Sequence, residues 1–116
     1  MRIIKIYDYT GENCVTPGDG ITIYSLVYEA LTKGDVVELD FLGISVYASP
    51  FFNMAIGKLL KDFSSEQLNK RLHLTHLSDD GLAILQKVIQ NANRFYADEQ
   101  FRKAQSEVIK ERGTEL

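Results

Sequence analysis

The chain has 116 residues and a formal net charge of −3 at pH 7, with 13 Lys or Arg and 16 Asp or Glu residues. This length suits one domain that buries a hydrophobic core without a disulfide or a metal. A hydrophobic content of 45% and a charged content of 25% are typical of a globular chain, not of a disordered one. The mildly acidic balance argues against a dedicated nucleic-acid-binding protein, which carries clustered Lys and Arg.

The single cysteine and the lack of a long apolar run bear on where the chain works. Cys14 alone cannot form an intramolecular disulfide, which suits the reducing cytoplasm. No apolar run approaches the roughly 18–20 residues of a membrane span, and residues 1–5 do not lead into the apolar stretch of a signal peptide. We therefore expect a cytoplasmic protein with no membrane partner, no nucleic-acid partner and no cofactor.

The first third of the chain contains two strand patterns and one helix pattern. The imperfect alternation of residues 2–7 predicts a strand, and residues 14–16 predict a short second strand. Residues 21–32 predict a helix, because apolar residues recur at helical spacing, with Asp19 or Thr22 as its cap. This helix has a first apolar stripe and a second one on another side. The first stripe contains Ile23, Leu26, Val27 and Ala30, and the second contains Ile21, Tyr24, Tyr28 and Leu31.

The middle of the chain predicts an interior strand followed by a helix. Residues 36–41 (VVELDF) are short, apolar and partly β-branched, as interior strands are. Ser49 and Pro50 predict the start of the helix, since serine is a favoured N-cap and proline a favoured first helical residue. The apolar stripe of this helix contains Phe52, Ala55, Ile56, Leu59 and Phe63.

The last part of the chain predicts a third main strand at residues 71–75 and a long helix that begins at Ser78 or Asp79. Residues 97–116 form a charged C-terminal helix or tail of the same domain. The tail has only a thin apolar stripe, so it either lies on the domain or docks on a partner. The stripe contains Phe101, Ala104 and Val108.

The order of these elements, joined by short links, predicts one α/β domain over residues 1–116. We expect a small mixed β-sheet of three to four strands with about four helices packed on it.

Residues 34–93 resemble a known family through two stretches of sequence. The first is VVELDFLGISVYASPFFNMAIGKLL and the second is LHLTHLSDDGLAILQKVIQNANRFY. In this order they are similar to the bacterial STAS-like domain family of unknown function, which is related to the STAS domains of anti-sigma factor antagonists. The resemblance implies a STAS-like fold and a role as a protein-interaction module.

Ser49 is the sharpest candidate for a regulatory site. In antagonist STAS domains an Asp-Ser-Ser-Gly word stands at this turn, and phosphorylation of its first serine switches partner binding. Here the word is Ala-Ser-Pro-Phe at residues 48–51, so only the serine is kept. A phosphate at a helix N-terminus meets free N–H groups and the positive end of the helix dipole, worth about 0.3–1 kcal/mol. The alternative is that Ser49 only caps the helix.

Residues near Ser49 and on the neighbouring helices form the predicted binding face. Asp40 ends a strand close to the same turn, where it contacts a partner or an ion, or accepts backbone hydrogen bonds from the following turn. Tyrosines favour interfaces because they combine a large area with a hydroxyl. The alternative for the helical residues is contact with the domain's own tail. Besides Asp40, the face contains Tyr24, Tyr28, Tyr47, Phe51 and Met54.

Other reactive side chains in the sequence favour structural roles. His73 and His76 point to opposite faces of a strand, so they do not easily share a metal, and no metal site is expected. Cys14 has no predicted base nearby and is interpreted as a buried structural thiol. The Gly-Asp-Gly word at residues 18–20 lacks the Gly-Lys-[Ser/Thr] ending of a phosphate-binding loop and is interpreted as a turn.

These observations predict a non-catalytic regulatory interaction module. No convergent set of nucleophile and base, paired carboxylates or metal ligands is found by spacing, so an enzyme is not expected. The resemblance implies a histidine-kinase-like ATPase as the partner, and a homo-oligomer is an additional option. The alternative hypothesis is an immunity, antitoxin-like or defence-operon protein that binds and blocks a partner.

Overall fold

The computed structural model describes the backbone of residues 1–111 and the side chains of residues 1–97. Three strands form a central sheet in the order β1-β3-β5, and every strand pair in it is parallel. A second parallel sheet contains only two strands, β2 and β4. The strands are β1 (Arg2–Lys5), β2 (Asn13–Cys14), β3 (Val37–Asp40), β4 (Val46–Tyr47) and β5 (Leu72–Thr75).

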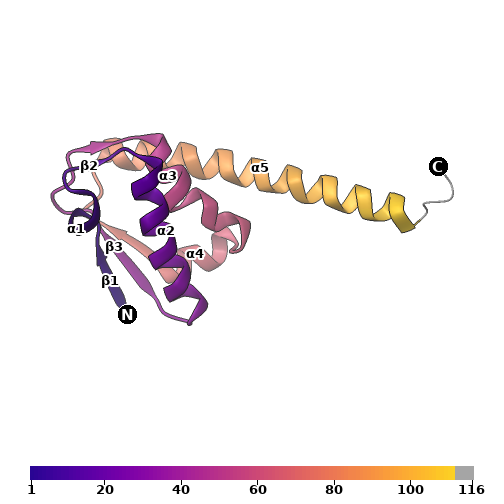
Figure 1. The fold of residues 1–116 in the computed structure, drawn as a ribbon, viewed down its shortest axis with the longest axis horizontal. Helices are drawn as coiled ribbons and strands as arrows, with labels where there is room; N and C mark the ends of the chain where they lie inside the picture. Colours follow the sequence, from indigo (N-terminus) through magenta and orange to yellow (C-terminus); the bar gives the residue numbers. More distant parts are fainter. Residues whose placement is uncertain (112–116) are drawn as a thin grey trace.

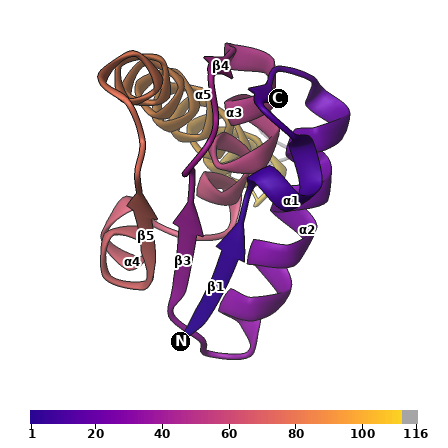
Figure 2. The same cartoon turned by 90° about the vertical axis from the view of Figure 1, so that its left-hand side faces the viewer.

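Helical segments connect the strands and pack on one face of the central sheet (Figures 1 and 2). Helix α5 continues past the rest of the chain, as Figure 1 shows. The segments are α1 (Tyr7–Thr10), α2 (Pro17–Thr32), α3 (Ser49–Ala55), the 3-10 helix η1 (Gly57–Lys61), α4 (Ser65–Arg71) and α5 (Asp79–Glu111). The end of the predicted tail, residues 112–116, lies outside the described residues, and its predicted apolar stripe lies outside the described side chains.

The predicted α/β class is confirmed, but the predicted single mixed sheet is wrong in detail. The structure has two sheets, and all their strand pairs are parallel. The reason is that each connection between neighbouring strands of the central sheet contains a helix, and a crossover of this length returns the chain in the same direction.

The helix boundaries also differ from the pattern. Helix α2 begins at residue 17 rather than 21, because the Thr16 hydroxyl caps it by accepting the Asp19 N–H (3.1 Å). Neither expected cap, Asp19 or Thr22, has this role. The helix expected after Ser49 is broken at Ile56 into α3 and η1. An apolar stripe with spacings of three and four residues does not distinguish an α-helix from two shorter segments that bury the same face.

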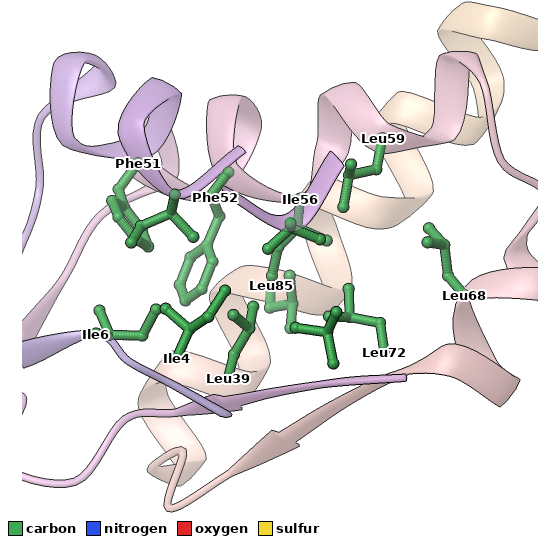
Figure 3. Packing of buried hydrophobic residues seen from close by; sticks show 14 of the residues in the cluster. Ile4, Ile6, Leu39, Phe51, Phe52, Ile56, Leu59, Leu68, Leu72 and Leu85 are labelled. Carbon is green, nitrogen blue, oxygen red and sulfur yellow. The ribbon is translucent and has the colours of Figure 1, made fainter. Parts of the chain in front are cut away.

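The hydrophobic core lies between the central sheet and the helices α2, α3 and α5 (Figure 3). From the sheet, Ile4, Leu39 and Leu72 point toward the helices, where Phe52 and Ile56 meet them. The opposite face of the sheet is not covered by helices in Figure 2. On β3, Glu38 and Asp40 alternate with buried residues and suit an open face, and the register places the exposed Ile3 of β1 beside Glu38 on the same face.

Helices α2 and α3 approach closely because α2 carries glycine at position 20. A Cβ atom on Gly20 would lie 2.5 Å from the Phe51 carbonyl oxygen and 2.8 Å from the Met54 Cβ atom. Gly18, one half-turn earlier in the same helix, has nothing within 4 Å of the same position. The glycine at position 20 therefore sets the distance between the two helices.

We expect Gly20→Ala to lower the free energy of unfolding by about 1–3 kcal/mol, because the α2–α3 contact has no room for a methyl group. Gly18→Ala is the matched control, and it should be neutral or stabilising by up to about 1 kcal/mol, since alanine favours a helix. Urea unfolding of the two variants measures both values. Equal stability of the two variants would contradict the close packing described here.

Candidate functional site

The three strands of the central sheet end at the same side of the molecule. Their last residues are Lys5, Asp40 and Thr75, and the segments that follow them gather at this side (Figure 2). We call this side, formed by residues 6–20, 41–50 and 76–86, the carboxyl end. In open α/β sheets, ligands are bound outside the carboxyl ends of the strands. A ligand site is therefore expected at the carboxyl end.

Ser49 is exposed at the carboxyl end and is the first residue of α3. The N-cap is Ala48, with extended backbone angles, and no side chain caps the helix. The interpretation of Ser49 as a cap is therefore wrong, because Pro50 occupies the second helical position and moves the serine into the helix. The Ser49 hydroxyl is left available to solvent.

Tyr47, the last residue of β4, is half-buried and anchors the backbone that leads to Ser49. Its ring stacks on the Phe52 ring with a centroid distance of 5.9 Å and an interplanar angle of 6°. The ring also borders a groove of about 480 Å³ between β4 and the start of α5, which we call the β4–α5 groove. The groove is lined by Ser45, Val46, Tyr47, Ser78, Asp80, Ala83 and Ile84.

Phe51 does not belong to an exposed face, and this part of the predicted binding face is wrong. Its side chain is fully buried, and its ring lies edge-on to the Phe52 ring at 5.4 Å. Helix α3 packs against α2 on one side and α5 on another, so residues off its main stripe are also buried. An apolar residue beside a core stripe on a short helix is consistent with this double burial.

Asp40 accepts two hydrogen bonds that fix its carboxylate at the end of β3. The Leu42 N–H donates to Asp40 Oδ1 (3.0 Å), as predicted for the turn, and His76 Nδ1 lies 2.8 Å from the same oxygen. The Leu42 bond, followed by the His76 bond, lowers the pKa of Asp40 from its ordinary value. The Asp40 side chain is 15% exposed, whereas His76 is 56% exposed.

The pairing with His76 was missed by the sequence interpretation because the two residues are 36 positions apart. Their proximity comes from the pairing of β3 with β5, which places Asp40 opposite Thr75. His76 adopts a positive φ of 58°, so its backbone turns sharply as β5 ends. A second hollow of about 350 Å³ lies beside this pair. It is lined by Lys5, Tyr7, Asp8, Asp40, Leu42 and Gly43, and we call it the β1–β3 hollow.

The remaining predicted residues lie around a different surface, formed by helices. Lys58 Nζ lies 4.8 Å from the centroid of the Tyr24 ring, and Tyr28 contacts the Phe63 ring edge-on at 5.8 Å. Burial is the main cause that raises the pKa of Tyr24. Met54 lines a groove of about 480 Å³ between α3, η1 and α5. The predicted face is thus divided between two surfaces, with Tyr47 and Ser49 at the carboxyl end.

Cys14 is fully buried, as the structural interpretation expects. Its sulfur lies 3.6 Å from the Thr10 hydroxyl, and burial raises the pKa of the thiol above its ordinary value. Within residues 1–97, no three His, Cys, Asp or Glu side chains are arranged to hold a metal ion.

Replacing Ser49 by alanine tests its lack of a capping role. We expect the free energy of unfolding to change by less than about 0.5 kcal/mol, as for an exposed side chain without a partner. Ser64→Ala should cost about 1 kcal/mol, because the Ser64 hydroxyl caps α4 by accepting the Gln67 N–H (3.1 Å). Thermal unfolding monitored by circular dichroism compares the two. If Ser49→Ala lowers the stability as much as Ser64→Ala does, the Ser49 hydroxyl caps α3 after all.

The lowered pKa of Asp40 makes stability depend on pH in a definite direction. The carboxylate stabilises the folded state above the pKa of the unfolded chain, and this contribution is lost as the pH falls through the lower folded pKa. Asp40→Asn should therefore cost about 1 kcal/mol near pH 7. The difference from the unsubstituted chain should shrink below about pH 4.

The control for this titration is Asp35→Asn, which removes an exposed carboxylate with no side-chain hydrogen bond to a described residue. Urea unfolding between pH 3 and 7 should give a pH-dependent difference for position 40 and a much smaller one for position 35. A constant loss for Asp40→Asn at all pH values would contradict the role of its charge.

Comparison with known proteins agrees with the arrangement of strands and helices. The family model described as a STAS-like domain of unknown function (DUF4325) matches residues 19–82. Neither the curated proteins nor the solved structures contain a match. None of the helices in the described part of the chain has the length and apolar character that a membrane crossing requires. Since the family model covers more than half of the chain, the protein belongs to the STAS-like domain family of unknown function.

Proposed function

We propose that the protein is a non-catalytic regulatory module that docks on another protein through its carboxyl end. The observation that carries the proposal is the Ser49 hydroxyl, which is exposed at the start of α3 and caps nothing. A side chain that the fold does not use is free to contact a partner or to be modified without loss of stability. Membership of a STAS-like family supports a regulatory interaction role.

Exposed apolar side chains around Ser49 support docking at this end. Leu42 is 64% exposed and Val46 is 48% exposed, although both flank a well-packed part of the core. Of the ten exposed large apolar side chains in residues 1–97, six lie at the carboxyl end. A concentration of exposed apolar side chains at one end of a small domain favours an interaction site there. The six are Tyr7, Tyr9, Val15, Leu42, Val46 and Leu82.

Phosphorylation of Ser49 would regulate the docking of a partner at this end. A phosphate adds nearly two negative charges at neutral pH. Placed between the apolar Val46 and the start of α3, these charges would have to lose water when a partner covers them, and this desolvation opposes docking. By resemblance to the antagonist STAS domains, the proposed partner is a histidine-kinase-like ATPase that also phosphorylates Ser49.

The charge-mimicking variant Ser49→Glu tests this proposal. We expect it to weaken binding to the proposed histidine-kinase-like ATPase partner by about tenfold or more, because a buried unpaired charge is costly. Its melting temperature should stay nearly unchanged. Binding is measured by isothermal titration calorimetry with the purified ATPase.

Ser65→Glu is the matched control, since Ser65 is also exposed and is also the first residue of a short helix, α4. Helix α4 lies away from the carboxyl end (Figure 2), so the Ser65→Glu variant should bind as the unsubstituted chain does. Equal loss of binding in both variants, or no binding of the ATPase to the unsubstituted chain, would contradict the proposed docking. Binding of a toxic nuclease instead would favour the immunity hypothesis.

A further inference from the structure

The charges of the chain are distributed unevenly between the carboxyl end and the rest. The segments 6–20, 41–50 and 76–86 contain no Lys or Arg, and the cations that directly adjoin them are Lys5 and Lys87. The same segments contain five carboxylates, from Asp8, Glu12, Asp19, Asp79 and Asp80. Since the whole chain has a net charge of only −3, the remainder is slightly positive and the carboxyl end is distinctly negative.

Both hollows of the carboxyl end combine apolar walls with carboxylates. In the β1–β3 hollow, Asp8 and Asp40 lie beside Tyr7 and Leu42. Tyr7 is held there by contact with the turn, because a Cβ atom on Gly43 would lie 3.2 Å from the Tyr7 ring. Lys5 also lines this hollow, and its positive charge offsets one of the two carboxylate charges there.

The β4–α5 groove repeats the combination with different residues. Asp80 lies there beside Val46, Tyr47 and Ile84. A side chain that fits both hollows has an aliphatic stem to cover the apolar wall and a cationic head to meet the carboxylate. Lysine and arginine have this build, since their methylene stems pack on apolar surface while the charged head stays polar.

We infer that the carboxyl end recognises a protein segment in which Lys or Arg alternate with large apolar side chains. The inference rests on the proposed docking at this end and adds the chemistry of the partner. The apolar side chains of the segment cover Leu42, Val46 and Ser49, and its cations enter the two hollows. A charge placed on Ser49 would therefore meet apolar side chains rather than a cation, as the proposed switch requires. The surrounding carboxylates accelerate association and make it sensitive to salt. A nucleic acid is excluded as the occupant of this surface by the sign of the charge.

A pair of synthetic peptides tests the inference on the full chain. One peptide contains leucine and lysine in amphipathic order, and the other replaces every lysine by glutamate. We expect the lysine peptide to shift amide NMR signals of residues 6–20, 41–50 and 76–86, and the glutamate peptide to shift none of them. Raising the NaCl concentration from 50 to 500 mM should weaken binding of the lysine peptide about fivefold or more.

Two sets of variants separate the charged and apolar contributions. The double variant Asp8→Asn, Glu12→Gln should weaken binding of the lysine peptide several-fold. The control Asp35→Asn, Glu66→Gln makes the same change of charge away from the carboxyl end and should leave binding unchanged. Val46→Ser should also weaken this binding. Phe95→Ser removes an apolar side chain of α5 that is more exposed than Val46 (62% against 48%), and it should not weaken binding.

Three results would overturn the inference: no binding of the lysine peptide, equal binding of both peptides, or NMR shifts outside the carboxyl end. None of these depends on Ser49 or on the ATPase, so the proposed ATPase partner and the Ser49 switch can fail while this inference holds. Conversely, an ATPase that docks here through an acidic surface would leave the proposed function intact and overturn the inference.

Discussion

The parallel pairing of β1, β3 and β5 is the constraint from which the arrangement of the surface follows. Parallel neighbours need long crossovers, and here each crossover contains helices that cover the same face of the sheet. The strands then all end at one side, so three segments distant in sequence meet there. Lys5 and Asp40 are neighbours for this reason, and so are Asp40 and Thr75.

Helix α3 links the core to this end of the molecule. Its buried aromatic residues, Phe51 and Phe52, pack against α2 and the Phe41 ring, and they fix the helix axis. The first turn of α3 therefore emerges from the core in one position, with Ser49 on the outside. The side chain that carries the proposed regulation is exposed because its neighbours are so firmly buried.

Much of the fold could be predicted from local patterns, because each pattern reports which face a segment buries. The stripe on α2 is an example, since Ile23, Val27 and Ala30 are all fully buried. The strand at VVELDF was also predicted, and Val37 and Leu39 are its buried residues. Such patterns state that a face is covered, but they do not state by what.

The candidate site was less predictable, because it depends on contacts between distant segments. The burial of Phe51 follows from the close approach of α2 at Gly20, which a single helix pattern does not contain. The pairing of Asp40 with His76 follows from the register of β3 and β5. Whether position 49 is the N-cap or the first residue of α3 depends on a shift of one residue. Capping rules applied to a sequence do not resolve a shift this small.

The short β2–β4 sheet gives the carboxyl end the rigidity that the proposed recognition requires. Its two strands contribute only a few backbone hydrogen bonds, yet each is anchored in the core, β2 by the buried Cys14 and β4 by the stacking of Tyr47 on Phe52. Val46 and Ser49 are therefore presented from a fixed backbone. A partner that covers them loses little free energy to the ordering of loops, so exposed apolar contacts of modest size can still give useful affinity. Without these anchors the same side chains would lie on a flexible connection between β3 and α3. Ordering that connection on binding would cost conformational entropy and lower the affinity.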